Sequence, residues 1–493
     1  MNRVTPAFRR RALASDLMTW HYETPARLAL HLAHDRGFFP WIAARGLNAF
    51  CYIRHTVDSR ARIDELAPLH REHQIASEYG GHVMHWLLPR DRFATNPEFF
   101  PVADGARNPK GNLCVSDAGA LAMVRERALL YLRENPDCAL LHLWGADVWD
   151  GAWCRCANCA ALSPQLQYLT VVNAVADALA AAGTAPDVTY LAYHDTLEPD
   201  PALDPRPNVA FEWAPRERCY SHAIDDPGCA TNPRYWDSLK RYIDLFDGRG
   251  HVFEYYADAI LFGGLSVATP SIIVRDLRAY RGLGLDSISC LTFGQHSLIA
   301  YPVNLATFAR ATQSPDFAPD QMLADTAAER HPRCAREMAA AYQAIARAST
   351  CLLDRGGDLM RPKPNLSTNS ARLRELKLAH AQISEAIAAA GQIVAPMRDS
   401  LVAAERELWE FQRELVSGIA DYLAAAAVNG SDRAKLGDAA INRIAAALAH
   451  LRAAGATHDD TWTAYDLEWV SEVWLDALRR RLADPAARGD ESA

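Results

Sequence analysis

Residues 141–159 read LHLWGADVWDGAWCRCANC, and this stretch decides how the rest of the chain is interpreted. A short apolar run ends at Trp144, two aspartates follow at Asp147 and Asp150, and three cysteines lie within the last six residues. Apolar strands that stop at a carboxylate are where parallel α/β enzymes place their chemistry. The stretch therefore predicts a buried strand followed by a loop that carries a functional site.

Short apolar runs alternate with amphipathic segments up to about residue 310, which is the pattern of an α/β protein. We predict eight strands, at Leu13–Trp20, Leu47–Arg54, His82–Leu88, Ala139–Trp144, Val188–Tyr193, Val209–Trp213, His251–Tyr255 and Ser287–Phe293. We predict helices between most of them, at Ala26–Arg45, Ala118–Glu134, Tyr168–Ala182, Tyr235–Phe246 and Ser271–Leu283. Eight strands separated by helices are typical of a (β/α)8 TIM barrel. A doubly wound sheet fits less well, because no glycine-rich phosphate loop follows the first strand.

Alanine-rich helical patterns replace this alternation beyond residue 315. They lie at Ala335–Leu353, Ser370–Ala395, Arg398–Ala427, Arg433–Ala454 and Thr463–Leu482. Such a series predicts an α-helical bundle. We therefore expect a catalytic barrel domain over residues 1–312 and a C-terminal helical domain over 313–493. The second domain is expected to pack on the first through Trp462, Trp469 and Trp474.

Composition excludes several classes of protein. The chain has 493 residues, half of them hydrophobic, and a formal charge of −9, without the basic stripe that a nucleic-acid-binding surface needs. No run of 18 apolar residues is present, so we expect no membrane span. The amino terminus lacks the apolar region of a signal peptide, which favours a cytoplasmic protein with mostly free thiols. We expect no cofactor, a carbohydrate as binding partner, and the helical domain as a site of homo-oligomer formation.

Polar and aromatic side chains follow the predicted strands, and in a barrel such positions meet at the carboxyl-terminal mouth. The residues that we predict to bind substrate are Trp20, His21, Glu23, Arg54, His85, Trp86, Trp144, Asp150, His194, Asp195, Arg216, Tyr255, Tyr256 and His296. Aromatic rings can stack on the apolar faces of sugars, and Trp20, Trp144 and Tyr255 are the ones we expect to be exposed. Arginines such as Arg54 and Arg216 can bind the carboxylate of an acidic sugar.

Two carboxyl groups facing each other across a glycosidic bond are what its hydrolysis requires. We predict that Asp147 is the general acid and that Glu254 or Glu212 is the nucleophile or base. The structural alternatives are that Asp147 caps the following loop and that each glutamate pairs with an arginine.

The cysteine cluster could bind zinc, or a disulfide within it could cross-link the loop. Cys154, Cys156 and Cys159 are weak zinc candidates that would need a fourth ligand, such as Cys219, Cys229 or His222. We favour a disulfide or free thiols, because the usual zinc signature has two closely spaced pairs and Cys219 and Cys229 are far apart.

Several segments carry a family resemblance: DVWDGAWCRCANC with the QYLTVVNAVADAL that follows, RERCYSHAIDDPGCATN and HVFEYYADAILFGG, with LGLDSISCLTFGQ and YPVNLATFA as weaker matches. On these segments the chain resembles an uncharacterised bacterial family of glycoside-hydrolase-like barrels related to α-glucuronidases and family 20 β-hexosaminidases. The resemblance implies a (β/α)8 barrel and a carbohydrate substrate. Family 20 enzymes carry an adjacent Asp–Glu pair after the fourth strand. Here Asp147 is followed by Val148, which argues against their substrate-assisted mechanism.

The predicted activity is that of a glycosidase acting on an oligosaccharide or a glycan derived from a polysaccharide. One alternative is a carbohydrate-binding barrel without catalysis. Another is a lyase or epimerase acting on acidic sugars, with His21, His194 or His296 as base and Arg54 or Arg90 as the carboxylate clamp. A metalloenzyme is a third alternative.

Overall fold

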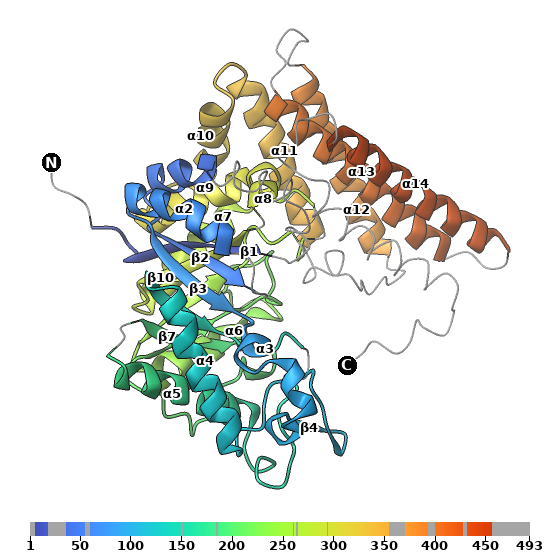
Figure 1. Ribbon diagram of the computed structural model, residues 1–493. Helices are drawn as coiled ribbons and strands as arrows, with labels where there is room; N and C mark the ends of the chain where they lie inside the picture. Colours follow the sequence, from blue (N-terminus) through green and yellow to red (C-terminus); the bar gives the residue numbers. More distant parts are fainter. Residues whose placement is uncertain are drawn as a thin grey trace. The chain divides into compact units, whose positions relative to one another are not determined.

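A closed barrel of eight parallel strands forms the first part of the protein (Figure 1). The computed structural model describes residues 5–17, 36–54, 60–148, 151–183, 186–259, 261–262, 265–292, 294–353, 370–392, 400–426 and 431–455. The barrel strands are β1 (Arg10–Leu17), β2 (Ala49–Arg54), β3 (Ala76–Gly81), β6 (Cys138–Leu143), β7 (Asp187–Ala192), β8 (Val209–Trp213), β9 (Gly250–Glu254) and β10 (Ser287–Thr292). Their spatial order is β1-β10-β9-β8-β7-β6-β3-β2, which confirms the predicted barrel.

Helices connect most of the barrel strands. They are α2 (Arg60–His73), α3 (Met84–Leu87), α4 (Ala118–Glu134), α5 (Pro164–Ala181), α6 (Asn232–Leu245) and α7 (Pro270–Gly282). The connection from β3 to α4 is long and also holds η3 (Arg90–Ala94), η4 (Pro97–Phe99) and a hairpin of β4 (Val102–Ala103) and β5 (Ala106–Arg107). Between β7 and β8 the described residues contain only the short 3-10 helix η5 (His194–Thr196).

Side-chain caps set where two of these helices begin. Asp117 accepts a hydrogen bond from the backbone N–H of Ala120, at 2.9 Å, at the start of α4. Ser163 accepts one from Leu166, at 3.2 Å, at the start of α5, where proline occupies the first helical turn. A capping oxygen satisfies an amide that the helix itself leaves unpaired, and proline at this position loses no helical bond. These caps fix the ends of the two loops that flank the candidate site.

The third strand lies before its predicted position. We predicted His82–Leu88, whereas β3 is Ala76–Gly81 and part of the apolar HVMHWLL segment forms the helix α3. Gly80 has a φ of 129°, and a Cβ atom there would lie 1.9 Å from the backbone oxygen of His142. β3 can therefore approach β6 closely only because this position has no side chain.

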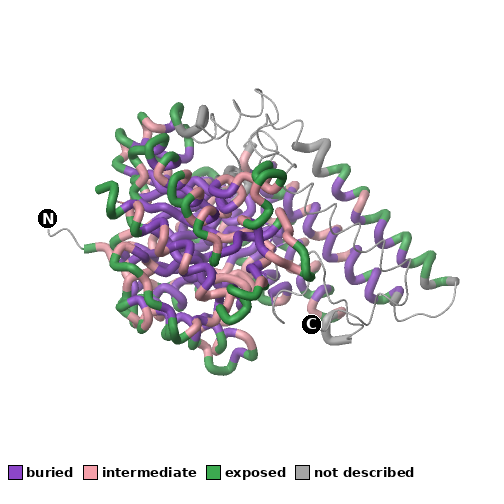
Figure 2. Tube along the Cα trace, turned by 60° about the horizontal axis from the view of Figure 1, so that its bottom comes forward, coloured by how far each residue is buried: buried purple, intermediate pink, exposed green. Residues whose placement is uncertain are grey.

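A series of helices follows the barrel. It comprises α8 (Gly294–Ala300), α9 (Pro302–Gln313), α10 (Gln321–Arg330), α11 (Ala335–Leu353), α12 (Ser370–Gly391), α13 (Ser400–Ala426) and α14 (Ser431–Gly455). The helices α11 to α14 pack consecutively, side by side, and bury one face each (Figure 1). In α11 that face includes Met338, Tyr342 and Ile345, at helical spacing. Figure 2 shows buried and exposed stretches alternating along the long helices.

The chain divides into two compact units. The first comprises Met1–Arg216, Pro233–Tyr255 and Ala279–Leu291, and the second comprises Glu217–Asn232, Tyr256–Arg278 and Thr292–Ala493. Two segments of the second unit thus come from the part of the sequence that we assigned to the barrel domain. The predicted packing residues Trp462, Trp469 and Trp474 lie outside the described residues. Among the described helices, none is long and apolar enough to cross a membrane.

Candidate active site

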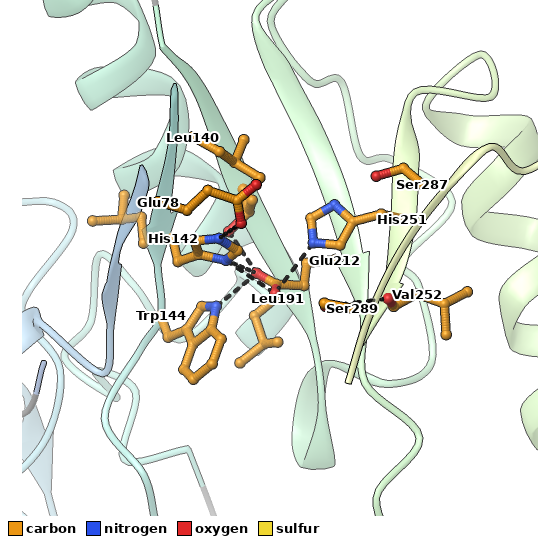
Figure 3. Close-up of polar contacts among 12 residues, drawn as sticks. Glu78, Leu140, His142, Trp144, Leu191, Glu212, His251, Val252, Ser287 and Ser289 are labelled. Atoms are coloured by element: carbon orange, nitrogen blue, oxygen red, sulfur yellow. Dashed lines mark hydrogen bonds and ion pairs between the residues drawn. The ribbon is translucent and has the colours of Figure 1, made fainter. Parts of the chain in front are cut away.

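A row of ionisable side chains crosses the interior of the barrel (Figure 3). Glu78, His142, Glu212 and His251 come from β3, β6, β8 and β9, and each is at most 2% exposed. His142 lies between the two carboxylates: its Nδ1 is 2.9 Å from Oε2 of Glu212, and its Nε2 is 3.2 Å from Oε2 of Glu78. Because both ring nitrogens face an acceptor, His142 is an imidazolium that donates to both.

The charges in this row shift one another's protonation. Burial alone would lower the pKa of His142, but the adjacent Cys51 and Glu212 raise that pKa well above its ordinary value. Burial alone would raise the pKa of Glu212, but the imidazolium of His142 holds that pKa well below its ordinary value. Arg10 binds Glu78 with 2.5 Å between Nη2 and Oε2, which outweighs burial and lowers the pKa of Glu78 to about 2. The carboxylates are therefore ionised and compensated at neutral pH.

Glu212 anchors Trp144 below the mouth of the barrel. Its Oε2 accepts hydrogen bonds from Trp144 Nε1, at 2.7 Å, and from Thr189 Oγ1, at 2.8 Å. The Nε2 of His251 lies 3.2 Å from its Oε1. The carboxylate is 0% exposed and surrounded by these partners, so this position does not suit the nucleophile or base that we predicted. Trp144 is 5% exposed, and the expectation that it presents an open face is wrong.

Glu254 points away from the barrel interior. Successive side chains of a strand alternate between its two faces, and His251 faces inward. Glu254, three residues later, accepts a hydrogen bond from the hydroxyl of Tyr280 on α7 and is 0% exposed. Its carboxylate therefore lies behind the strand, on the side of α7. This geometry does not place Glu254 beside a substrate in the mouth, as its predicted catalytic role would require.

Asp147 and His82 meet at the carboxyl ends of β6 and β3. The Asp147 side chain is 57% exposed, and its Oδ1 lies 3.8 Å from Nε2 of His82, which is 14% exposed. The other ring nitrogen, Nδ1, is 2.7 Å from the carbonyl oxygen of Gly145. Because a carbonyl only accepts, Nδ1 carries a hydrogen and Nε2 faces the carboxylate. Asp147 is thus an accessible carboxylate with a fixed imidazole beside it.

The loop that carries Asp147 is held at both ends by Asn112, a residue that we did not predict. Asn112 is 1% exposed. Its Oδ1 accepts from the backbone N–H of Ala146, at 2.7 Å, and its Nδ2 donates to the carbonyl of Gly151. Its own N–H donates to the carbonyl of Ala152, at 3.1 Å. A single buried amide therefore fixes the turn from which Asp147 projects.

Further groups at this end of the barrel follow β7. Tyr193, His194 and Asp195 are all partly exposed. The ring of Tyr193 lies 6.5 Å from that of His82. Oδ2 of Asp195 accepts a hydrogen bond from Nε1 of Trp153, at 2.9 Å. The structure thus brings two predicted residues, His194 and Asp195, to the same region as the unpredicted Tyr193.

Aromatic rings form the floor beneath these groups. The Trp144 ring contacts those of His82, at 5.0 Å, and Phe253, at 5.4 Å, in both cases edge to face. Phe253 in turn contacts Tyr255, at 5.3 Å. Tyr255 is 6% exposed, so it too lacks the open face expected of it. Its ring and that of Trp144 shape the base of the mouth.

Comparison with known sequences assigns the family. The profile of a family described as Domain of unknown function (DUF4838) matches residues 6–288. The chain belongs to this DUF4838 family. The match covers more than half of the chain, including Asp147 and the row of buried charges. No curated protein sequence matches the chain.

Two solved structures share the fold of this DUF4838 protein. One is a GH138 enzyme targeting pectin rhamnogalacturonan II, with a TM-score of 0.54 and 10% identity over 97% of this chain and 84% of that chain. The other is a family GH115 4-O-methyl-α-glucuronidase with specificity for decorated arabinogalactans, with a TM-score of 0.59 and 13% identity over 95% of this chain and 62% of that one. The expected likeness to barrel glycoside hydrolases is thereby confirmed for the fold. Neither structure is named as a family 20 hexosaminidase.

The remaining predicted substrate residues of the DUF4838 protein lie elsewhere or outside the described residues. Trp86 packs against α4, with the Arg127 guanidinium 4.5 Å from its ring, and its neighbour His85 lies on the same short helix, α3. Tyr256 belongs to the second unit and donates to Asp276, at 3.0 Å. Arg216 follows β8 and is partly exposed. The residues outside the described chain or without a described side chain are Trp20, His21, Glu23, Arg54, Asp150 and His296.

Six of the eleven cysteines of the DUF4838 protein fall in two separate groups. Cys154, Cys156 and Cys159 gather around Cys114, which precedes α4 and was not predicted as a ligand. Cys219, Cys229 and His222, expected as sources of a fourth ligand, form their own group within the second unit instead.

A cavity of about 490 Å3 opens at the opposite end of the barrel. Arg10, Glu78, His251 and Ser287 line it, and these residues lie at or near the amino ends of their strands. Barrel enzymes place their chemistry at the carboxyl ends. We therefore assign the candidate active site to the mouth that carries Asp147, not to this cavity.

Proposed function

We propose that this protein is a glycoside hydrolase and that Asp147 is its general acid. The observation that carries the proposal is the placement of Asp147: an accessible carboxylate after the fourth strand of a glycosidase-like barrel, 3.8 Å from the fixed imidazole of His82. A general acid must reach the leaving-group oxygen and exchange its proton. An exposed side chain on a rigid turn meets both needs.

His82 would act as a positioning residue. Its Nδ1–H is bound to the Gly145 carbonyl, so Nε2 presents either a lone pair to protonated Asp147 or a hydrogen to ionised Asp147. At 3.8 Å the contact is an ion pair and not a hydrogen bond, so His82 would act on the Asp147 carboxyl through its charge. Tyr193, partly exposed nearby, would contact one face of the sugar.

For the second carboxylate we propose Asp195 in place of Glu212 and Glu254. Asp195 follows β7, the strand next to β6, and is partly exposed, whereas both glutamates are 0% exposed. The Trp153 indole donates to its Oδ2, which orients the group. In a retaining enzyme the second carboxylate is the nucleophile, and in an inverting enzyme it is the base that activates water.

The experiment is a screen for sugar release, followed by two variants. The panel includes oligosaccharides from pectin and arabinogalactan, because two of the similar solved structures are named for those polymers. It also includes aryl glycosides with good and poor leaving groups. Asp147→Asn should lose about 100- to 10,000-fold in kcat on poor leaving groups and much less on good ones, which need no protonation. Asp195→Asn should lose activity on substrates with good leaving groups and on substrates with poor ones. Unchanged turnover in Asp147→Asn would overturn the assignment.

Burial of Glu212 and Glu254 also favours a second reading, a barrel that binds carbohydrate without cleaving it. Binding of a glycan without release of sugar, measured by calorimetry and product analysis on the same panel, would support this reading. An ultraviolet-absorbing unsaturated product would instead identify a lyase.

A further inference from the structure

Four cysteine thiols from two distant segments meet in one cluster in the first unit. Cys114 precedes α4, and Cys154, Cys156 and Cys159 lie in the loop between β6 and α5. Their four Sγ atoms all lie within 4.8 Å of one another. Cys114 Sγ is 3.7 Å from that of Cys156 and 3.9 Å from that of Cys159. These are the distances at which four thiolates surround a single metal ion.

The spacing matches one geometry in particular. A tetrahedral zinc centre with Zn–S bonds of about 2.3 Å places its sulfur atoms about 3.8 Å apart. A disulfide would bring two sulfur atoms to about 2.05 Å, and all four cysteines are free. We propose that Cys114, Cys154, Cys156 and Cys159 bind one zinc ion as a structural tetrathiolate site.

The surroundings of the cluster suit a closed, structural site. Cys114, Cys154 and Cys159 are each at most 2% exposed and Cys156 is partly exposed, so most of the cluster is closed to solvent. Four protein sulfurs already fill the tetrahedral shell, whereas a catalytic zinc keeps one position open. On binding Zn2+, each thiol releases its proton to solvent and donates a sulfur lone pair to the metal.

Hydrogen-bond donors are in place for the charge that such a site would carry. Four thiolates around Zn2+ leave a net charge of −2. The backbone N–H of Val102 is 3.4 Å from Cys154 Sγ, and the Arg107 guanidinium is 4.0 Å from the same atom. The Ser116 hydroxyl, which can donate one hydrogen bond, lies 3.3 Å from the sulfur atoms of both Cys114 and Cys159. Such outer donors orient and stabilise metal ligands.

A second set of bonds fixes the ligand-bearing loop. The side chain of Gln167 on α5 accepts from the backbone N–H of Cys154, at 3.0 Å, and donates to its carbonyl, at 3.1 Å. It also contacts the carbonyl of Cys159, at 3.4 Å. The buried amide therefore preorganises the Cys-x-Cys-x-x-Cys segment before the ion binds.

The ion would cross-link the two segments that position Asp147. Cys114 lies two residues after Asn112, which holds both ends of the Asp147 loop. Cys154 lies two residues after Ala152, whose carbonyl accepts a hydrogen bond from the backbone N–H of Asn112. Zinc would thus close a loop of about forty residues and brace the turn that carries the proposed general acid, without contacting substrate itself.

The test measures metal in the full-length protein. We expect the wild type to contain about one zinc per chain more than the double variant Cys156→Ser/Cys159→Ser, by elemental analysis. A matched control, Cys351→Ser on α11, should keep the wild-type content. Comparing the two variants isolates this cluster from the Cys219, His222 and Cys229 group. Equal zinc in the double variant and the wild type would overturn the proposal, as would iron in place of zinc.

A second measurement does not depend on the folding of a variant. Wild-type protein stripped of metal under reducing conditions and titrated with Co2+ should develop the intense visible and near-ultraviolet bands of a tetrahedral tetrathiolate cobalt centre. Added Zn2+ should abolish them. Weak bands of an octahedral ion, or bands that zinc does not displace, would contradict the site.

Discussion

His82 and Asp147 face each other at the carboxyl ends of two neighbouring strands, with Nε2 of the imidazole 3.8 Å from Oδ1 of the carboxylate. The imidazole cannot turn freely, because Nδ1 is bound to the Gly145 carbonyl, and its ring rests edge to face against Trp144, at 5.0 Å. Trp144 is held in turn by Glu212, at 2.7 Å. The buried charges thus set the geometry of the His82–Asp147 pair.

Replacing the imidazole tests this pair. His82→Gln keeps an amide donor for the Gly145 carbonyl but has no group that titrates near neutral pH. We expect kcat to fall about 10-fold, with a smaller change in KM and a displaced pH–rate profile. The control variant His380→Gln, on α12, should leave kcat, KM and the pH–rate profile unchanged. In the double variant with Asp147→Asn the losses should not add, because the two residues act together; full additivity would show that they act independently.

Removing the charge of Glu212 should destabilise the barrel. Glu212→Gln leaves the His142 imidazolium without one of its two carboxylates in a site that is 0% exposed. Breaking a buried pair on one side costs about 3–5 kcal/mol of unfolding free energy. Urea denaturation measures the loss. Asp177→Asn, which removes an exposed partner of Arg206, is the matched control and should leave the midpoint unchanged. A fully stable Glu212→Gln protein would contradict the compensation that we describe.

The same row of charges predicts how stability depends on pH. The pKa of Glu78 falls from 4.5 to about 2 on folding, because Arg10 outweighs burial. Its contribution, on the order of 3 kcal/mol, is present above pH 4.5 and is lost as the pH falls toward 2. His142 has a raised pKa, so its contribution is full below its unfolded pKa and is lost as the pH rises through the folded one.

Urea midpoints measured between pH 7 and about pH 3 should therefore fall on acidification. The Glu78→Gln variant should be less stable at neutral pH and should show a flatter acid limb, because the residue that takes up the proton is gone. A wild-type midpoint that rises below pH 4.5 would contradict the assigned shift.

The fold was predictable because most strands have a clear apolar pattern between turns. β8 has the bounds that we predicted, Val209–Trp213, and most other strands shift by a few residues. β3 was misplaced because its sequence, ASEYGG, is rich in residues that strands disfavour. The close approach to β6 explains Gly80, where a Cβ atom would meet the backbone of His142. That error hid His82, because the predicted strand begins at His82, whereas the observed strand ends just before it.

The site was less predictable, since burial on both faces of a parallel strand removes the signal that tells inward from outward residues. In HVFEYY, the sequence pattern does not tell whether Phe253 or Glu254 faces the barrel interior. The answer depends on register with β8, where His251 lies opposite Glu212. Cys114 was equally hidden, because forty residues separate it from Cys154 and only the fold brings their thiols together.

Tyr193 is the aromatic residue through which we expect the mouth to contact a sugar, since Trp144 and Tyr255 are buried. It is partly exposed, and its ring lies 6.5 Å from that of His82. Tyr193→Ala should raise KM by about 3- to 10-fold, the loss expected for one stacking contact, with a smaller effect on kcat. Tyr193→Phe retains the ring and should keep KM within about twofold. An unchanged KM in Tyr193→Ala, with native thermal stability, would place the sugar on a different face of the mouth.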